Sequence, residues 1–594
     1  MLVFGVILIL SPFILVFTFN DRLKGILVAS TVSIAFIILV SILTQSVHIF
    51  GYLSVCSSYI ILAVVAFVIF FKNKKTVKIR FPILFIVALA VVSFELISIH
   101  YHYTGYVETV KYEPLVVNDS YPYPLFSDEW TEASITNYSI KTHVLPTTNP
   151  LMVNELIPNL LIPFDSMLAG FFVLLGLSPI SDFAILAIIF GILVSASVYV
   201  ATRCWGIGKF SSAIVFLLIP YITNGANLPG IWFLLPYIAS AVPFFIMLAC
   251  LGKREYVLAS IASFLSLILY PPFIVFIAPA FLIAVFLEYR NHRLEKSKAL
   301  TYFAWPFAVA SMCGLVFLLF GHDRSVTFSY IEHALFHRGL DLGIPSYGIW
   351  NVIPIITFPF IFIGCIDISS RRLFPCVALI VTGLSYWVLY AFYPDVIIIE
   401  YPRIVVITSL ILLFVAGFGI DWLLSYFKQY MSFTYSSGAV LFVERVATIL
   451  IGLIFIVASF WYPIGQEWKT FNIFENKGRG TIMIEPSQPL NRYLAPDDLA
   501  IWQGISGRNF TAPPWKGLVI GAATGNFPLE TKPSTITVDI MPYESFISAD
   551  CPSKDVLARR YLISYAYSSP FDCPNFSDLK ESSEGLHLYK YIGS

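Results

Sequence analysis

Residues 151–177 read LMVNELIPNLLIPFDSMLAGFFVLLGL, and the topology of the whole chain depends on whether this stretch crosses a membrane. It is long enough to cross, because a helix needs about 20 apolar residues to span the hydrocarbon core. Five polar or helix-disturbing residues interrupt it, namely Asn154, Glu155, Asn159, Pro163 and Asp165. The stretch can therefore be interpreted either as a span or as a helical segment at the membrane surface.

The composition surrounding this stretch is that of a membrane protein. Of 594 residues, 58% are hydrophobic and only 12% are charged, whereas soluble domains carry about 25% charged residues. This excludes a soluble enzyme and a disordered scaffold. The chain has 36 basic and 36 acidic residues, and this balance argues against a nucleic acid as partner.

Apolar windows long enough to cross a bilayer occur about fourteen times along the chain. They fall near residues 2–19, 25–44, 50–71, 82–99, 181–201, 210–224, 230–251, 255–270, 271–288, 300–320, 348–366, 373–393, 403–424 and 445–463. The sequence therefore predicts an all-α polytopic membrane protein with about fourteen transmembrane helices.

Basic residues in the short loops decide how 151–177 is interpreted. If this stretch stays at the surface, every short basic loop falls on the same side of the membrane, as the positive-inside rule requires. If it crosses, all later loops change sides, and the basic loops no longer lie on one side of the membrane. We therefore predict a juxtamembrane, partly embedded segment at 151–177. The N-terminus, the loop 100–150 and the C-terminal tail are then extracytoplasmic.

Three parts follow from this topology. Residues 1–81 carry N-terminal transmembrane helices, residues 82–463 form the main transmembrane region, and residues 464–594 are polar enough for a small extracytoplasmic α+β domain. In that domain we predict a helix from Pro496 and strands at 517–522, 535–540, 560–566 and 586–592. Cys551 and Cys573 are predicted to form a disulfide, the alternative being two free thiols.

The loop 100–150 holds the first candidate site. Asp128 and Glu129 are adjacent and precede Trp130. Such carboxylates can act as a general base or hold a divalent cation, and the plainer alternative is a solvated acidic turn. Glu95 lies one turn inside the preceding span, and a carboxylate at that depth is a functional candidate. Hydrogen bonding to a neighbouring helix is its structural alternative.

Arginines near the outer ends of later spans form the second candidate site. Arg403 begins a span and follows Glu400 and Tyr401. Its guanidinium suits a phosphate or pyrophosphate, because its fixed donors match phosphate oxygens in pairs. Glu400 could instead serve as its ion-pair partner. Further candidates for anion binding lie in the outer loop 321–347, namely His322, Arg324 and Arg338.

With these features together, the chain resembles the GT-C superfamily of integral membrane glycosyltransferases, and within it the protein mannosyltransferase and aminoarabinose transferase-like group. Asp128-Glu129 stands where the acidic motif of the first outer loop would be, and 151–177 where the juxtamembrane helix would be. The late-loop Arg segment is matched by Glu400-Tyr401-Pro402-Arg403, and the appended domain by 464–594. Three additional spans precede the region that resembles the family.

The resemblance implies an activity and roles for these residues. A sugar would pass from a polyprenyl-phosphate donor in the membrane to a hydroxyl of a glycan, lipid or protein acceptor on the extracytoplasmic face, with inversion. Asp128 would be the general base, and Glu129 would orient the acceptor or help to hold a cation. Arg403, with Arg324 or Arg338, would stabilise the phosphate leaving group. The sequence shows no certain cofactor; a divalent cation, Mg²⁺ or Mn²⁺, at Asp128 and Glu129 is a candidate.

Two other functions remain open from the sequence. A lipid-linked polysaccharide polymerase or ligase would depend on Arg324 and Arg338 and leave Asp128 dispensable. A multispan transporter would usually show internal repeats and polar residues at mid-membrane, whereas the polar residues of this chain gather near the outer ends of the spans.

Overall fold

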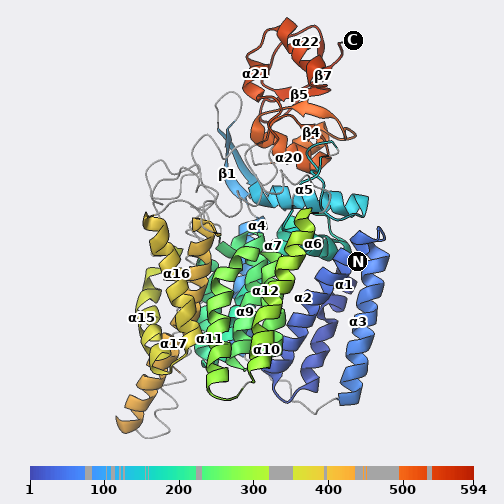
Figure 1. Cartoon of the computed structure of the whole chain (residues 1–594). Coiled ribbons are helices and arrows are strands. Elements are labelled where there is room, and N and C mark those ends of the chain that lie inside the picture. Colours follow the sequence, from blue (N-terminus) through green and yellow to red (C-terminus); the bar gives the residue numbers. More distant parts are fainter. Residues whose placement is uncertain are drawn as a thin grey trace.

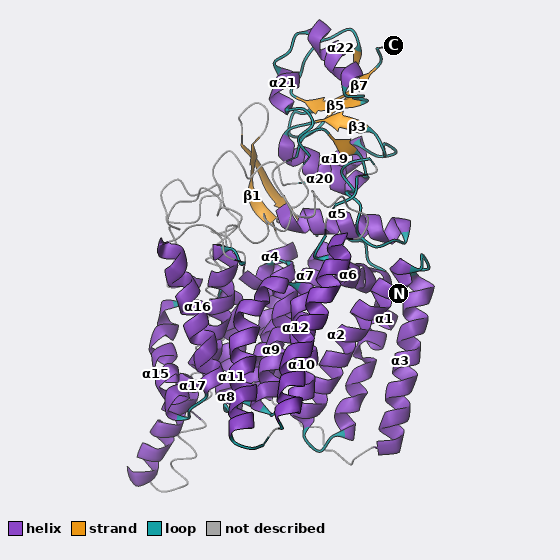
Figure 2. Ribbon diagram, in the orientation of Figure 1, coloured by secondary structure: helices purple, strands orange, loops and turns teal. Residues whose placement is uncertain are grey.

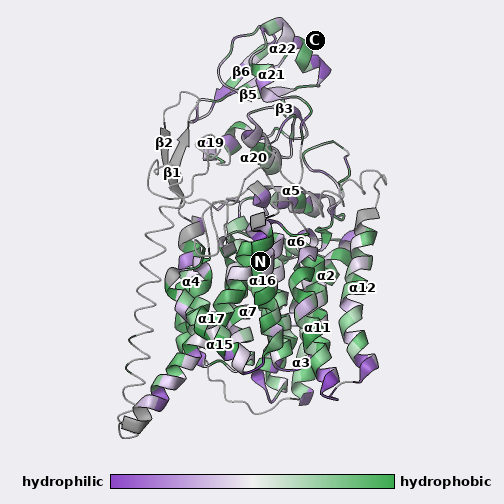
Figure 3. Cartoon of the chain, turned by 60° about the vertical axis from the view of Figure 1, so that its left-hand side comes forward, coloured by the Kyte–Doolittle hydropathy of each residue, from purple (hydrophilic) through white to green (hydrophobic). Residues whose placement is uncertain are grey.

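The chain folds into a helical bundle that carries a small mixed domain at one end (Figure 1). The computed structural model describes residues 1–594 except 74–82, 102, 109–113, 120–121, 125–126, 154, 158, 223–229, 294, 320–351, 393–397, 435–445, 447–449, 451–493, 532–537 and 594. Hydrophobic residues fill the middle of the bundle and hydrophilic residues gather at its ends (Figure 3). This distribution fits helices that lie across a bilayer.

The bundle contains most of the predicted spans as helices. In chain order they are α1 (Leu2–Leu10), η1 (Ser11–Thr18), α2 (Arg22–Ser46), α3 (Tyr52–Asn73), α4 (Ile83–Tyr101), α6 (Ile162–Leu175), α7 (Phe183–Cys204), α8 (Lys209–Leu218), η2 (Ile219–Tyr221), η3 (Gly230–Trp232), α9 (Pro236–Gly252), α10 (Tyr256–Leu269), η4 (Pro271–Phe273), α11 (Ile274–Arg290), α12 (Lys296–Leu319), η5 (Ile355–Thr357), α15 (Phe358–Ser370), α16 (Phe374–Phe392) and α17 (Tyr401–Thr434).

Six helical segments of the described chain are long and apolar enough to cross a membrane. They are Arg22–Ser46, Tyr52–Asn73, Phe183–Cys204, Pro271–Arg290, Lys296–Val316 and Tyr401–Tyr430. Eight more apolar helices of 10–17 residues are shorter than a full span. The predicted window at 445–463 lies outside the described residues apart from Val446 and Leu450. The prediction of a polytopic helical protein is therefore confirmed, and the total of about fourteen spans stays a prediction.

One end of the bundle is held by ion pairs between its short turns. Lys24 in the first turn of α2 pairs with Glu255 at 2.5 Å, and Asp21, which caps α2, pairs with Lys253 at 2.8 Å. The start of α2 is therefore tied to the turn between α9 and α10. This end lies opposite the C-terminal domain (Figure 2). The basic residues of these turns therefore lie at the same end of the bundle.

The stretch 151–177 forms a shorter helix than expected. α6 begins beside Pro163 in its first turn and ends at Gly176, whose left-handed backbone (φ 67°) stops the helix. Most of α6 is buried, and it packs against α1, α2, α3, α5 and α10. The described residues of 151–161 are not helical, and Thr148 forms a bridge with Leu156.

Another helix lies across the end of the bundle. This is α5 (Ser127–Thr142), which runs over the ends of the bundle helices and under the C-terminal domain (Figure 1). Asp128 and Glu129 lie in its first turn and Lys141 in its last, which matches the charges favoured at the two ends of a helix. Before it, β1 (Tyr103–Glu108) and β2 (Pro114–Asp119) pair antiparallel.

The C-terminal domain is a small α+β unit. Its five strands run in the order β4-β3-β5-β7-β6, with β3 parallel to β4 and β5 and the remaining pairs antiparallel. The elements are α19 (Pro496–Ile501), β3 (Asn509–Thr511), α20 (Pro514–Thr524), β4 (Phe527–Pro528), α21 (Tyr543–Ile547), α22 (Cys551–Arg560), β5 (Tyr565–Ser568), β6 (Phe576–Glu581) and β7 (His587–Tyr591).

One predicted strand of this domain is wrong. Residues 517–522 are the middle of α20, because Pro514 starts a helix there and Gly525, with φ 74°, ends it. Of the others, the strand at 586–592 corresponds to β7, while 560–566 overlaps only the first residues of β5. The strand at 535–540 falls partly outside the described residues, and Asp539 forms an isolated bridge with Glu530.

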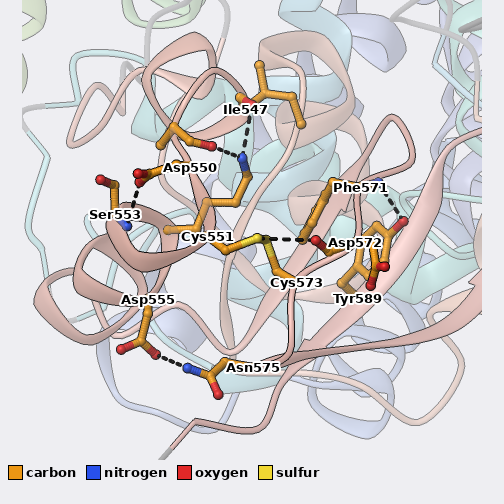
Figure 4. The surroundings of a disulfide bond; sticks show 12 residues. Ile547, Asp550, Cys551, Ser553, Asp555, Phe571, Asp572, Cys573, Asn575 and Tyr589 are labelled. Atoms are coloured by element: carbon orange, nitrogen blue, oxygen red, sulfur yellow. Dashed lines mark hydrogen bonds between the residues drawn. A yellow bond between two sulfur atoms is a disulfide. The ribbon is translucent and has the colours of Figure 1, made fainter.

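A disulfide closes the outer part of the domain (Figure 4). Cys551 is the first residue of α22 and bonds to Cys573, with 5.4 Å between their Cα atoms. Asp550 caps α22 by accepting from Ser553 N at 3.0 Å. The disulfide thus ties the capped start of this helix to the segment before β6.

Candidate functional site

Arg403 lies at the end of the bundle that α5 covers. Its Nη1 donates to the Tyr270 hydroxyl at 3.0 Å, and its Nε pairs with Glu400 at 3.2 Å. The guanidinium carbon lies 5.5 Å from the ring centre of Tyr270 and 6.0 Å from that of Tyr237. Two aromatic rings and one carboxylate therefore surround a cation whose side chain is 29% exposed.

Prolines position both tyrosines. Tyr270 precedes Pro271 and Pro272, and α10 stops before it because a residue before proline is driven out of the helical region (φ −152°, ψ 93°). Tyr237 follows Pro236, which starts α9. Each ring is thus presented by a helix end on the side where α17 begins.

Asp128 on α5 faces this arginine. Its carboxylate interacts electrostatically with Arg403 and with Tyr237. Asp128 is half-buried, so it contacts both protein and solvent. Two residues that the sequence analysis assigned to separate clusters are therefore brought together by the ends of α5 and α17.

Glu132 is a site residue that the sequence analysis did not select. It lies one helical turn after Asp128 and shares its face of α5. It meets Asp165 of α6, which accepts a hydrogen bond from Asn159 Nδ2 at 2.7 Å. Burial raises the pKa of Glu132 well above its ordinary value, and Asp165 and Asp128 raise it further, while Arg403 opposes them. In the sequence, the i, i+4 spacing between Asp128 and Glu132 was the signal that could have identified Glu132 as a site residue.

Glu129 and Glu95 occupy different, more buried places. Glu129 accepts the backbone N–H of Leu234 at 2.7 Å and is 1% exposed, so it ties α5 to the start of α9. Glu95 accepts from the Tyr221 hydroxyl at 3.1 Å and is 2% exposed. These contacts match the structural alternative for Glu95.

Of the remaining candidates from the sequence, two lie next to Arg403 and three fall outside the described residues. Tyr401 accepts from Trp387 Nε1 at 3.1 Å, so it holds the start of α17 against α16 beside Arg403. Glu400 is the ion-pair partner that the sequence suggested. His322, Arg324 and Arg338 lie outside the described residues.

The described carboxylates fit a divalent cation poorly. Asp128 and Glu129 are successive residues of a helix and point about 100° apart, and Glu129 is already engaged by Leu234 N. Among the described residues, no group of three or more His, Cys, Asp or Glu side chains could hold a metal ion. We therefore derive no chemical step through a cation.

The C-terminal domain rests on α5 through α20. Trp515, Leu518 and Val519 of α20 belong to the same hydrophobic core as Trp130 of α5 and Leu151. The helix that carries Asp128 is therefore packed between the bundle and this domain, as Figure 1 shows.

A buried ionic cluster fixes α20 within its own domain. Lys516 Nζ lies 2.7 Å from both Asp498 Oδ2 and Glu584 Oε1, and Tyr567 donates to Asp498 Oδ1 at 2.5 Å. Burial raises the pKa of Glu584 to about 7, with Lys516 opposing and Asp498 reinforcing the shift. One cation faces two carboxylates, so a proton on Glu584 balances the cluster near neutral pH.

Comparisons with known proteins give a limited answer. No protein-family model matches the chain, and no curated protein matches it in sequence. Similar solved structures include the Archaeoglobus fulgidus oligosaccharyltransferase in its apo form (TM-score 0.44, 12% identity) and tethered by a disulfide to an acceptor peptide with the NVT sequon (TM-score 0.42, 13% identity). Each match covers 82% of this chain and 69% of that chain. At this similarity no activity can be transferred between the proteins, so function has to rest on the residues of the site.

Proposed function

We propose that this protein is a membrane glycosyltransferase of the GT-C kind, which moves a sugar from a polyprenyl-phosphate donor to an acceptor hydroxyl. The observation that carries the proposal is the electrostatic interaction between Asp128 of α5 and Arg403 of α17 at one end of an apolar bundle. A carboxylate able to accept a proton lies beside a guanidinium able to hold a phosphate. A donor with a lipid chain reaches such a site from the bilayer that the helices span.

The reaction follows from these two groups. Asp128 accepts the proton of the acceptor hydroxyl as its oxygen attacks the anomeric carbon of the sugar. The bond from that carbon to the phosphate oxygen breaks, and its electron pair leaves with the polyprenyl phosphate. Arg403 stabilises the negative charge that grows on this oxygen. A single attack from the opposite side inverts the anomeric configuration.

Arg403 has donors to spare for a phosphate. A guanidinium carries five N–H groups, and within the described residues Tyr270 and Glu400 engage Nη1 and Nε. The rings of Tyr237 and Tyr270 are each only 4% exposed and pack against the guanidinium, so they fix its orientation for the donor phosphate. The site therefore offers a phosphate-binding guanidinium that two buried aromatic rings hold in place.

We place the reaction on the extracytoplasmic face. The basic turns at 21–24 and 253–254 lie at the end of the bundle away from α5, and basic loops are typical of the cytoplasmic side. The acceptor, whether glycan, lipid or protein, would then approach beneath the C-terminal domain.

The direct test is a donor panel. Purified protein in nanodiscs is incubated with radiolabelled polyprenyl-phosphate sugars and candidate acceptors, and wild type is compared with Asp128→Asn. Transfer from one donor that the substitution abolishes, with an inverted product, supports the proposal. A product that keeps the donor's configuration contradicts single-step transfer.

The same experiment separates the other two functions. A polymerase or ligase that uses a lipid diphosphate would keep its turnover in Asp128→Asn. A transporter would bind a donor lipid but release no sugar from it in either protein. Either result would overturn the proposal.

A further inference from the structure

Glu132 and Asp165 form a carboxyl pair between α5 and α6. Glu132 is 3% exposed and Asp165 is fully buried, and the two side chains interact with each other by hydrogen bonding and by charge. Two carboxyl groups held so close away from water cannot both be ionised, so they retain one proton between them.

The surroundings show which member holds the proton. Asn159 Nδ2 donates to Asp165 Oδ2 at 2.7 Å, and a donated hydrogen bond favours the ionised form of a carboxyl. Among the described residues no third side chain or backbone N–H donates to Glu132 Oε2 or to Asp165 Oδ1. Glu132 is therefore the acid that donates to the Asp165 carboxylate.

Few charged groups face this pair. Within the part of the chain that the structure describes, they are Asp165 on α6, Asp128 on α5 itself and Arg403 on α17. α20 also packs against α5, but its Lys516 is engaged by Asp498 and Glu584. The net charge of the Glu132–Asp165 pair is therefore set by whether the pair keeps its shared proton.

We propose that the Glu132–Asp165 pair is a proton-dependent latch, which fastens α5 to α6 and so positions Asp128 over Arg403. Both are positioning residues and touch no substrate. The latch stands on the packing of α5 and α6, and only its consequence for transfer rests on the proposed function.

A loss of the proton releases the latch. When Glu132 ionises, two buried carboxylates repel each other across the interface between the helices. α5 then loosens at the turn that carries Asp128. Gln at position 132 can still donate to Asp165 and has no proton to lose, so Glu132→Gln should keep the latch closed at every pH.

Hydrogen–deuterium exchange tests this without any substrate. Full-length protein in nanodiscs is labelled between about pH 6 and about pH 9, and rates are corrected for intrinsic exchange. In the wild type, exchange in residues 127–142 should rise by about tenfold beyond the intrinsic change. Glu132→Gln should stay protected. Glu155→Gln, at an exposed residue, is the matched control and should behave as wild type.

Two outcomes would overturn the latch. One is protection of α5 in the wild type that does not depend on pH, and the other is a Glu132→Gln protein that loses protection as the wild type does. If Glu132→Gln does not fold, Asp165→Asn serves instead, since it also removes the second charge and should make protection independent of pH.

The role of the latch in positioning has its own readout. Where transfer is measured, the alkaline fall of kcat should disappear in Glu132→Gln while the KM for donor is unchanged. Persistence of that fall would contradict the positioning of Asp128. Absence of transfer from every donor would refute the proposed function and leave the exchange result standing.

Discussion

Arg403 shows how a single residue acquires its properties from distant parts of the chain. Tyr270 comes from the end of α10, Tyr237 from the start of α9 and Asp128 from α5. From the sequence, only Glu400 could be named as its partner, because it lies three residues away. The other contacts depend on tertiary packing, which periodicity and spacing do not encode.

Replacement of Arg403 by Lys should weaken binding of the donor phosphate. Lysine keeps the charge but loses the planar fork that matches phosphate oxygens in pairs. We expect the KM for donor to rise about tenfold, corresponding to about 1.4 kcal/mol. Arg371→Lys, at an arginine paired with Asp367 elsewhere on the bundle, is the control and should leave KM unchanged. Equal KM values for wild type and Arg403→Lys would count against a phosphate at this position.

Glu584 should make the stability of the C-terminal domain depend on pH. Burial raises its pKa in the folded domain to about 7, from an ordinary value of 4.5. The folded domain thus binds this proton more tightly than the unfolded chain, so the contribution is complete below about pH 4.5 and is lost as pH rises through about 7. We expect a loss on the order of 3 kcal/mol, because each pKa unit corresponds to about 1.4 kcal/mol.

This effect is measured by thermal unfolding of the domain within the full-length protein, monitored by limited proteolysis. Glu584→Gln carries no titrating group and should flatten the pH profile between about 5 and 8. Glu544→Gln, at an exposed glutamate of the same domain, should retain the wild-type slope. A wild-type Tm that rises with pH in this range would show that the sign is wrong.

At the scale of elements, the sequence predicts long apolar helices well and their interfaces poorly. Windows such as 25–44 and 373–393 correspond to α2 and α16, because a continuous apolar run has few alternatives in a membrane. The strand predicted at 517–522 was wrong, because an apolar run bounded by Gly fits a strand or a buried helix equally well. The Glu132–Asp165 pair was missed because it exists only where α5 meets α6.

The close packing of α20 gives a prediction for this element. A Cβ on Gly521 would lie 2.9 Å from Leu151 Cδ2 and 3.2 Å from Asn526 O, so Gly521→Val must displace α20 from its seat. We expect a destabilisation of about 1–3 kcal/mol and faster cleavage of the C-terminal domain by protease. Ser506→Val, which adds a similar side chain at an exposed position, should be neutral. Unchanged protease resistance in Gly521→Val would contradict this packing.

The topology of the whole molecule predicts which parts share a side of the membrane. The C-terminal domain and α5 lie at one end of the bundle, and the turns around Asp21 and Arg254 lie at the other (Figure 1). In intact cells, a membrane-impermeant maleimide should label Ser506→Cys, whereas Lys298→Cys should react only after permeabilisation. The reverse pattern would invert the topology and place the site on the cytoplasmic face.

The central claim is that Asp128 removes a proton while Arg403 holds the donor, and a single-turnover measurement tests it most directly. Wild type, Asp128→Asn and Arg403→Lys are each mixed with a range of concentrations of the active polyprenyl-phosphate sugar. We expect Asp128→Asn to lower the rate at saturation by at least about 100-fold with donor affinity retained, and Arg403→Lys to weaken donor affinity. An Asp128→Asn protein that transfers sugar at the wild-type rate would contradict the account.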